Sequence, residues 1–325
     1  MTTRCDGNVT NTTSAPIPRC RISRNTVQVI IPAFNGGEKL LSCLHSFLNQ
    51  TTDAPMPVIV VDNASSDGSV SEAQRRFCAL EVIRNESNLG FGAACNQGIN
   101  LAIERGAEFI LLANQDTIAS NDLLEKLLVA AREYSHAGVI GPKTLSFDPM
   151  PDGRPRLAYA GSWRCMLPLR QRVPGINQAD SGAVTTPRQV DYVWGHGMLL
   201  RTAALKKVGL FDRGFFMYYE DLDLCDRMKS AGWELWCAPR AVMWHDVRDG
   251  ARAQDSELWR WRHKVQSARY FHRKRFTPVT SELLTAATII LEALSLLRNR
   301  HVRAAGHLFW VWNCTLFNST HKTFL

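Results

Sequence analysis

Short apolar runs alternate with segments of helical periodicity through the first third of the chain. Four runs have the β-branched and apolar composition of buried strands: Val27–Pro32, Pro57–Val61, Leu80–Arg84 and Phe109–Ala113. The segments between them predict helices that include Leu40–Phe47, Val70–Phe77 and Phe91–Arg105. This alternation predicts a parallel sheet with helices on its faces.

The alternation fades after Pro142. Residues 146–190 are rich in Pro, Gly, Arg and Gln, which predicts an irregular insertion. Order returns at Val190–Arg201, a turn that leads into a strand. Two further short strands are predicted at Glu234–Trp236 and Ala241–Trp244.

Composition places the 325-residue chain among globular proteins, with 45% hydrophobic and 21% charged residues. Its nine cysteines are odd in number and lack the paired spacing of metal ligands, which favours a reducing cytosol. The N-terminus is polar and shows no apolar signal core before Val27, so residues 1–24 are predicted to be a mobile tail. The glycosylation sequons at Asn8 and Asn318 are then chance matches.

The net charge of +8 is concentrated near the C-terminus. From Arg260 onward the chain has eleven Lys or Arg against two Glu, a balance of +9, which indicates an anionic partner there. Aromatic residues are interleaved with these cations, and two apolar stretches follow, Leu283–Leu297 and Ala304–Phe317. Neither stretch offers twenty uncharged residues, so no membrane-spanning helix is predicted.

Two interpretations of this C-terminal part stay open. Basic residues beside Trp, Phe and Leu suit a helix that lies in the interface of an anionic membrane. The alternative is a helical pair that packs on the main domain. Interleaved cations and aromatic residues also occur in proteins that bind nucleic acid, but no matching fold signature is present, so no nucleic-acid partner is predicted.

A cluster of carboxylates stands out between Tyr218 and His245. Four acidic residues fall within seven positions: Glu220, Asp221, Asp223 and Asp226. The apolar residues among them have helical spacing, which places Asp221 near a helix start. A carboxylate held there beside others is electrostatically perturbed, as a general base must be, although a well-capped surface helix is the simpler interpretation.

Polar clusters directly follow three of the predicted strands, and in parallel sheets ligands bind beyond these strand ends. The clusters are Asn35, Asp62-Asn63 and Asn114-Gln115-Asp116. A fourth segment, Asn88–Gly92, combines glycines with a helix start, where free N–H groups can meet phosphate.

Taken together, these segments resemble the inverting nucleotide-sugar glycosyltransferases of family 2, and most closely their bacterial rhamnosyltransferase-like branch. The motifs that carry the resemblance lie between Val27 and His245: Val29–Asn35, Val60–Gly68, Asn88–Gly92 with Asn96 and Gly98, Leu111–Asp116, Gly209–Asp212, Glu220–Asp223 and His245. The resemblance implies an α/β fold of the GT-A type, with a mostly parallel central sheet and a C-terminal helical extension. The implied boundaries are 25–250 for this domain and 251–325 for the extension, with a donor half at about 25–120 and an acceptor half at about 121–250.

The resemblance also implies roles for individual residues. Asp221 is the candidate base that takes a proton from the acceptor hydroxyl, with Glu220 beside it. Asp116 and His245 are candidate ligands of a divalent metal, Mg²⁺ or Mn²⁺, at the diphosphate. Asp62 is implied to hydrogen-bond the nucleotide base of the donor. The full set of residues implied to bind the donor is Pro32, Ala33, Asn35, Asp62, Asn63, Asn88, Gly90, Asn114 and Gln115.

Asn114 departs from the family pattern, because it stands where the first Asp of the metal-binding element is expected. It removes a negative charge near the ion, so weaker metal binding is expected. His196 is a second candidate for the site, with a structural hydrogen-bonding role as the alternative.

The leading hypothesis is an enzyme that moves L-rhamnose from dTDP-L-rhamnose to a lipid-linked or growing glycan, at the cytoplasmic face of the membrane, in cell-surface polysaccharide synthesis. The alternatives are a family 2 transferase with a UDP- or GDP-linked donor, a nucleotidyltransferase, and a binding module without catalysis. A nucleotidyltransferase would show a Gly-rich basic signature where this chain has Ala33-Phe34-Asn35. A binding module without catalysis has no reason to keep Asp116, Asp221 and His245 together, and all three are present.

Overall fold

The computed structural model describes residues 27–51, 57–78, 80–164, 171–246, 257–298 and 302–317. The predicted tail at 1–24 and the sequons at Asn8 and Asn318 lie outside these residues. The first elements alternate as predicted, with ends shifted by one or a few residues: β1 (Val27–Ala33), α1 (Gly37–Leu48), β2 (Val58–Asp62), α2 (Ser69–Arg76), β3 (Glu81–Arg84), α3 (Phe91–Glu104) and β4 (Phe109–Ala113).

The middle of the chain is more regular than predicted. Its elements are β5 (Thr117–Ala119), α4 (Leu123–Glu133), β6 (Ala137–Ser146), β7 (Arg156–Tyr159), β8 (Trp163–Arg164), β9 (Gln171–Arg172), β10 (Arg188–Gln189), β11 (Gly197–Arg201), α5 (Thr202–Val208), α6 (Glu220–Ser230) and β12 (Glu234–His245). The segment predicted to be an irregular insertion therefore carries four short strands. β5, α4 and β6 were missed as well, although the buried leucines of α4 have clear helical spacing.

The two predicted strands near residue 240 are one strand, β12. The register shifts between Ala238 and Val242, where Pro239 lacks a backbone donor, so the strand bulges and continues. Because the apolar pattern is broken at the bulge, the sequence suggested two strands.

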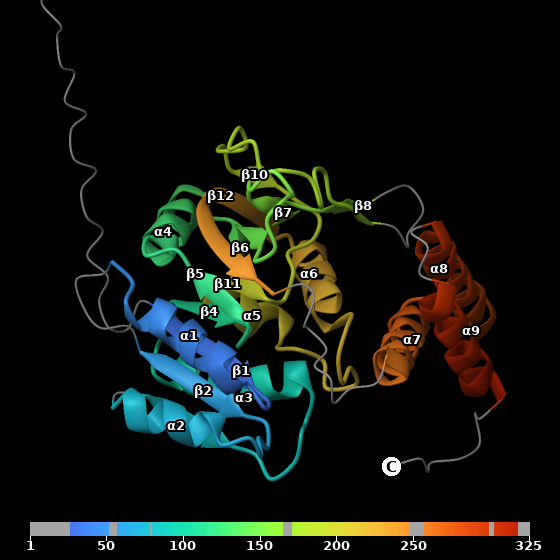
Figure 1. Ribbon diagram of the computed structural model, residues 1–325, viewed down its shortest axis with the longest axis horizontal. Coiled ribbons are helices and arrows are strands. Elements are labelled where there is room, and N and C mark those ends of the chain that lie inside the picture. The colour runs from blue at the N-terminus through green and yellow to red at the C-terminus, as the bar shows by residue number, and fades with distance from the viewer. Residues whose placement is uncertain are drawn as a thin grey trace, which may run out of the picture.

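One large sheet organises the molecule (Figure 1), with the strand order β10-β12-β6-β11-β4-β1-β2-β3. The block β4-β1-β2-β3 is parallel, as predicted, and β6 pairs in parallel with β12. Strand β11 joins the two blocks by antiparallel pairing with both β4 and β6. The carboxyl ends of β1, β2 and β4 therefore lie at one edge.

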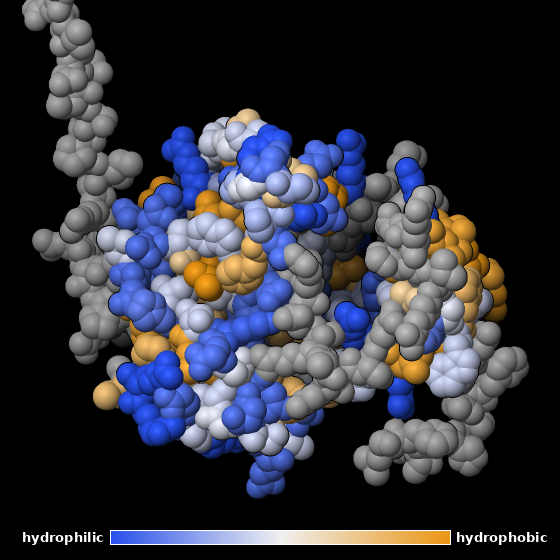
Figure 2. All heavy atoms as spheres, in the orientation of Figure 1, coloured by the Kyte–Doolittle hydropathy of each residue, from blue (hydrophilic) through white to orange (hydrophobic). Residues whose placement is uncertain are grey.

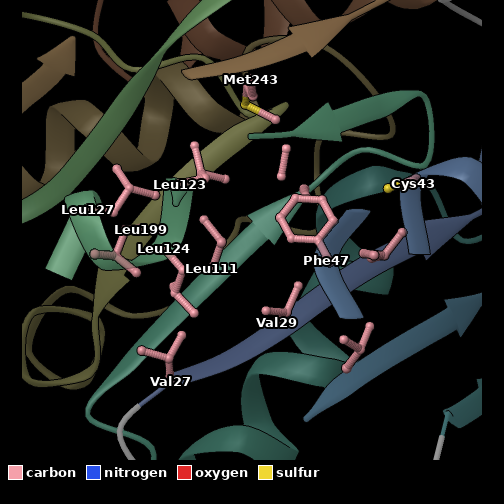
Figure 3. Close-up of a cluster of buried hydrophobic side chains, with 14 of the residues drawn as sticks. Val27, Val29, Cys43, Phe47, Leu111, Leu123, Leu124, Leu127, Leu199 and Met243 are labelled. Atoms are coloured by element: carbon pink, nitrogen blue, oxygen red, sulfur yellow. The ribbon is translucent and has the colours of Figure 1, made fainter. Parts of the chain in front are cut away.

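Helices cover both faces of the sheet. Along β1, Val29 contributes to the cluster that contains α1 and α4, whereas Ile30 points to the cluster that contains α3 and α6. This alternation is the period of two that a strand imposes on its side chains. Figure 3 shows the first cluster, where Phe47 and Leu124 pack near Val29 and Leu111.

Three C-terminal helices form a separate cluster (Figure 1): α7 (Glu257–Arg273), α8 (Pro278–Arg298) and α9 (Val302–Phe317). Helix α7 contacts the main domain, because Ser267 Oγ donates to Met217 O at 2.7 Å and the rings of Phe215 and Tyr270 meet at 4.8 Å. These contacts agree with the packing interpretation of the C-terminal part. The domain boundaries themselves remain predictions.

Candidate active site

A cavity of about 1100 Å³ opens beyond the carboxyl ends of the central strands and extends to helices α7 and α8. Most of the residues singled out from the sequence line it: Pro32, Ala33, Asn35, Asn63, Asn88, Asn114, Gln115, Asp116, Glu220, Asp221 and His245. Asp62 and Gly90 do not line it. The fold thus brings together residues that are up to 213 positions apart in the sequence (Pro32 to His245).

Asp62 lies behind the cavity, where it orders its own loop. It is buried, with Oδ2 2.7 Å from Arg84 Nη1 and Oδ1 accepting a hydrogen bond from Ser65 N at 2.9 Å. Each carboxylate oxygen has a second lone pair, so these contacts are compatible with a further donor. The contact between Asp62 and a nucleotide base remains a prediction.

Amide side chains build the wall that follows β2 and β3. Asn63 Nδ2 donates to Asn88 Oδ1 at 2.7 Å, and the same oxygen accepts a hydrogen bond from Gly90 N at 2.9 Å. Gly90 has φ +85°, and a Cβ there would lie 2.3 Å from Phe216 O. Glycine is therefore required at this position, because it lets the segment before α6 approach the start of α3.

Gln115 ties the ends of β4 and β1 together. Its amide exchanges two hydrogen bonds with the backbone N–H and C=O of Phe34, each of 3.0 Å. Asn35 adopts φ +48°, and its Oδ1 accepts a hydrogen bond from Ser66 N at 2.8 Å. These bonds hold the three loops that follow β1, β2 and β4 in one arrangement.

Strand pairing brings His245 to the end of β4. In the antiparallel pair of β12 and β5, His245 lies opposite Thr117, and His245 Nε2 is 3.3 Å from Asp116 Oδ1. Two buried polar atoms, His245 Nε2 and Asn114 Oδ1, have no hydrogen-bond partner among the described residues. An oxygen and a nitrogen left unpaired beside a carboxylate suit a divalent cation.

His196 packs against this group. Its ring stacks on His245 with centroids 4.5 Å apart, and its Nε2 is 2.8 Å from Thr144 Oγ1. Burial, and then the neighbouring His245, lower the pKa of His196 well below its ordinary value, so the ring is neutral. Its contacts favour the structural alternative over a direct role in binding.

The acidic pair lies at the start of α6, as predicted. The two residues before it, Tyr218 and Tyr219, both have positive φ, at +69° and +67°, a strained turn that is typical of functional sites. Asp221 Oδ2 accepts a hydrogen bond from Gly195 N at 2.8 Å, and the Tyr192 hydroxyl donates to the same carboxylate.

Burial perturbs both carboxyls. It raises the pKa of Asp221, while the hydrogen bonds from Tyr192 and Gly195 favour the ionised form and limit the rise. Burial, and then the charge of Asp221, raise the pKa of Glu220 well above its ordinary value. Glu220 Oε2 has no hydrogen-bond partner in the described part of the chain. The pair thus combines a carboxyl group whose protonated form is favoured, Glu220, with a neighbouring carboxylate held by the donors Gly195 N, Leu222 N and the Tyr192 hydroxyl.

The chain matches the profile of glycosyl transferase family 2 over residues 28–209. It is also 30% identical to the N-acetylglucosaminyl-diphospho-decaprenol L-rhamnosyltransferase of Mycobacterium tuberculosis (strain ATCC 25618 / H37Rv), over 72% of this chain and 80% of that protein. The chain belongs to glycosyl transferase family 2. It is therefore a glycosyltransferase, which sets aside the nucleotidyltransferase hypothesis.

Further similarities place this family 2 glycosyltransferase among known folds. It is 40% identical to rhamnosyltransferase WbbL of Escherichia coli (strain K12), over 31% of this chain and 39% of that protein. The mannosyltransferase PcManGT from Pyrobaculum calidifontis, solved with GDP-Man and Mn²⁺, superposes with a TM-score of 0.56 at 17% identity, covering 94% of this chain and 92% of that one. This structural similarity confirms the GT-A fold.

Sequence reasoning missed several residues of the glycosyltransferase cavity. Tyr192 and Gly195 hold Asp221, yet they are 29 and 26 positions away from it. Trp259, Arg260 and Lys264 of α7 also line the cavity. The alternation of cations and aromatic residues in this segment predicted contact with lipid or packing on the main domain, and not a place in the cavity.

Proposed function

We propose that this glycosyltransferase transfers L-rhamnose from dTDP-L-rhamnose to a hydroxyl of a lipid-linked glycan acceptor, with inversion of the anomeric carbon. The observation that carries the proposal is the presence of the carboxylate pair Glu220 and Asp221 in one cavity with the amide wall of Asn63 and Asn88. The similarity to two rhamnosyltransferases supports the choice of sugar.

Asp221 acts as the general base in this proposal. The acceptor hydroxyl attacks the anomeric carbon in line with the leaving diphosphate, and its proton passes to the carboxylate. Gly195 and Tyr192 orient that carboxylate with their hydrogen bonds. Burial, and then the charge of Asp221, favour the protonated form of Glu220, which limits the negative charge beside the base.

We further propose that Asp116, His245 and Asn114 hold a divalent cation. The two unpaired buried atoms beside Asp116 support this assignment. Among the described residues no group of three or more His, Cys, Asp or Glu side chains could hold a metal ion. The remaining ligands would come from the donor diphosphate and water, as is usual for Mg²⁺, and a bound cation would neutralise charge on the leaving group.

The enzyme also associates with a membrane in this proposal, through α8. By length and composition α8 could cross a bilayer, and it is the one such helix in the part of the chain that the structure describes. One face of α8 packs on α7 and α9. The opposite face exposes a row of apolar side chains at helical spacing: Val279, Leu283, Ile290, Leu294 and Leu297. Figure 2 shows hydrophobic residues gathered over the C-terminal helices. A helix that is buried on one side and apolar on the other suits a peripheral position at the cytoplasmic face.

The basic residues directly after α7 do not support an electrostatic attraction to the membrane. Lys274 Nζ and Arg275 Nη2 each lie 2.9 Å from Asp223 Oδ1, and Lys274 also pairs with Asp212. Their charges are neutralised within the chain, so we assign membrane contact to the apolar row of α8.

A screen of nucleotide sugars tests the donor. Thermal-shift measurements should show stabilisation by dTDP-L-rhamnose above that by UDP-, GDP- and other dTDP-linked sugars, because ligand binding to the folded state raises Tm. Transfer of radiolabelled rhamnose to a synthetic lipid-linked acceptor should follow the same donor order. Stabilisation and transfer with a UDP- or GDP-linked sugar instead would overturn the rhamnose assignment.

A further inference from the structure

The cavity has two ends of different chemistry. Toward β1, β2 and β4 it is lined by side-chain amides. Toward the C-terminal helices its lining includes aromatic and aliphatic side chains, two cations and one carboxylate: Trp259, Arg260, Trp261, Lys264, Glu292 and Leu308.

The segment that leads into α6 contacts both ends. Phe216 O accepts a hydrogen bond from Phe91 N at 2.9 Å, next to the amide wall. One residue later, Met217 O accepts a hydrogen bond from Ser267 of α7 at 2.7 Å. Asp221 follows four residues after Met217 and lines the same cavity.

Arg260 is an unusual cation at the helical end. It is half-buried, and among the described residues it has neither an ion pair nor a hydrogen bond, with its Nε buried and unpartnered. Its neighbours differ, because Lys264 pairs with Glu292 at 2.7 Å and Arg273 pairs with Glu282 at 2.7 Å. The buried Trp261 Nε1 also lacks an acceptor in the described part of the chain.

A partly buried guanidinium without a counter-ion is costly, and two neighbouring donors without acceptors add to that cost. An anion with several oxygens would balance the charge of Arg260, because guanidinium binds phosphate through paired hydrogen bonds. The apolar side chains around it would at the same time contact a hydrocarbon chain.

We propose that the helical end of the cavity is the subsite for the phosphate-bearing head of an amphiphilic acceptor, with Arg260 on the phosphate and Trp259, Trp261 and Leu308 along the hydrocarbon. The ligand class is a polyprenyl diphosphate. This inference rests on the proposed function, since it assigns the part of a lipid-linked acceptor that the transferred sugar does not touch.

Titration with farnesyl diphosphate tests the subsite directly. Binding to the full chain should quench tryptophan fluorescence, because Trp259 and Trp261 flank the ligand. Arg260→Gln should weaken this binding about ten- to hundredfold, the effect of losing a hydrogen bond to a charged group, and Arg260→Lys should weaken it less. Arg262→Gln is the matched control, because Arg262 is exposed and does not line the cavity. Farnesol and inorganic diphosphate should each bind more weakly than farnesyl diphosphate.

Steady-state kinetics separates the acceptor phosphate from the donor phosphate. Arg260→Gln should raise KM for a diphosphate-linked acceptor, with no change in KM for the donor or for the same glycan without phosphate. A rise in donor KM, or an equal rise for both acceptors, would overturn the proposal. Because the titration contains no sugar donor, its result for the subsite is valid even if rhamnose is the wrong sugar. If farnesyl diphosphate does not bind the parent protein, the proposed subsite is ruled out, even if rhamnose transfer is confirmed.

Discussion

At the scale of single residues, Asp221 differs from the other carboxylates of its cluster in its partners. Asp223 and Asp226 are paired with Arg and Lys side chains, which stabilise them as anions. Asp221 is held instead by neutral donors, the Gly195 N–H and the Tyr192 hydroxyl, in the wall of the cavity. A carboxylate without a counter-ion keeps its ability to accept a proton, which a base requires.

Asp221→Asn should therefore lower kcat by about 10²–10⁴-fold, the usual contribution of general base catalysis. The amide keeps the size of the side chain, so the donor Kd should change little. Turnover measured under saturating donor, together with donor titration, checks both statements. Near-normal turnover would rule out Asp221 as the base.

Tyr192→Phe should shift the pH dependence of the reaction. The hydroxyl stabilises ionised Asp221 and so lowers its pKa; its removal raises that pKa further. Because the base works only when ionised, the acidic limb of the kcat/KM profile should move to higher pH, by about one unit for one hydrogen bond to a charge. A uniform loss of rate with an unchanged profile would indicate a purely structural role for Tyr192.

Asn114→Asp should tighten metal binding. It places a carboxylate where Asn114 Oδ1 is now buried without a partner, next to Asp116. Added negative charge favours a divalent cation, so half-maximal activity should need less Mg²⁺ or Mn²⁺ than in the parent. Asp116→Ala should weaken donor binding and abolish stimulation by either ion. If chelator leaves the activity of the parent unchanged, the metal roles of Asp116 and His245 are wrong.

At the scale of elements, α6 links the cavity to the C-terminal helices. Its first turn places Glu220 and Asp221 in the cavity, while Asp223, fully buried two residues later, binds Arg227, Lys274 and Arg275. Burial tends to raise the pKa of Asp223, but the hydrogen bonds from Lys274 and Arg227 outweigh it, and the pKa is lowered. The paired anion thus stabilises the fold above the pKa that this carboxyl has in the unfolded chain, and this stability is lost as pH falls through its lower folded value.

The double change Lys274→Gln with Arg275→Gln should loosen α7 from α6. It leaves the buried Asp223 with fewer partners, which is destabilising, so Tm should fall by several degrees at neutral pH. Arg273→Gln is the control, because Arg273 is more than half exposed and pairs with Glu282. Tm from differential scanning fluorimetry should be nearly unchanged in the control. Equal Tm in both variants would mean that these ion pairs do not hold α7 in place.

At the scale of the whole molecule, the row of exposed apolar side chains on α8 has no packing partner that accounts for it among the described residues. Leu283 and Leu294 are 67% and 56% exposed, although the opposite side of the helix is packed. Such a face favours contact with lipid. In the proposed function, its position on the helices that line the cavity would bring the enzyme to its lipid-linked acceptor.

Leu283→Gln with Leu294→Gln should release the protein from vesicles. Because the attraction is apolar, binding of the parent to neutral and anionic vesicles should persist at high salt, whereas an electrostatic contact would be screened. Co-sedimentation at low and high salt checks this, with Val129→Gln as the control, since Val129 is an exposed apolar residue of α4. Binding to anionic vesicles alone, lost at high salt, would contradict the apolar contact.

The sequence by itself determined the features that depend on neighbouring residues. The strands of the first 113 residues follow from apolar runs, and the helix start at Glu220 follows from local spacing and charge. The positions of Asn35, Asn63 and Asp116 after strands placed them at one edge, because parallel strands share their direction. Most of the family motifs lie in these same segments, with Gly209–Asp212 and His245 outside them.

The tertiary structure alone decided which distant groups meet. His245 reaches Asp116 because β12 pairs with β5 in one register, and Asp221 receives its hydrogen bond from Tyr192 through the packing of α6 on the loop before β11. Local patterns specify which side of an element is apolar, but not the register or the partner of that side. For the same reason the charges of Lys274 and Arg275 were visible in the sequence, while their partner Asp223, 51 and 52 positions away, was not.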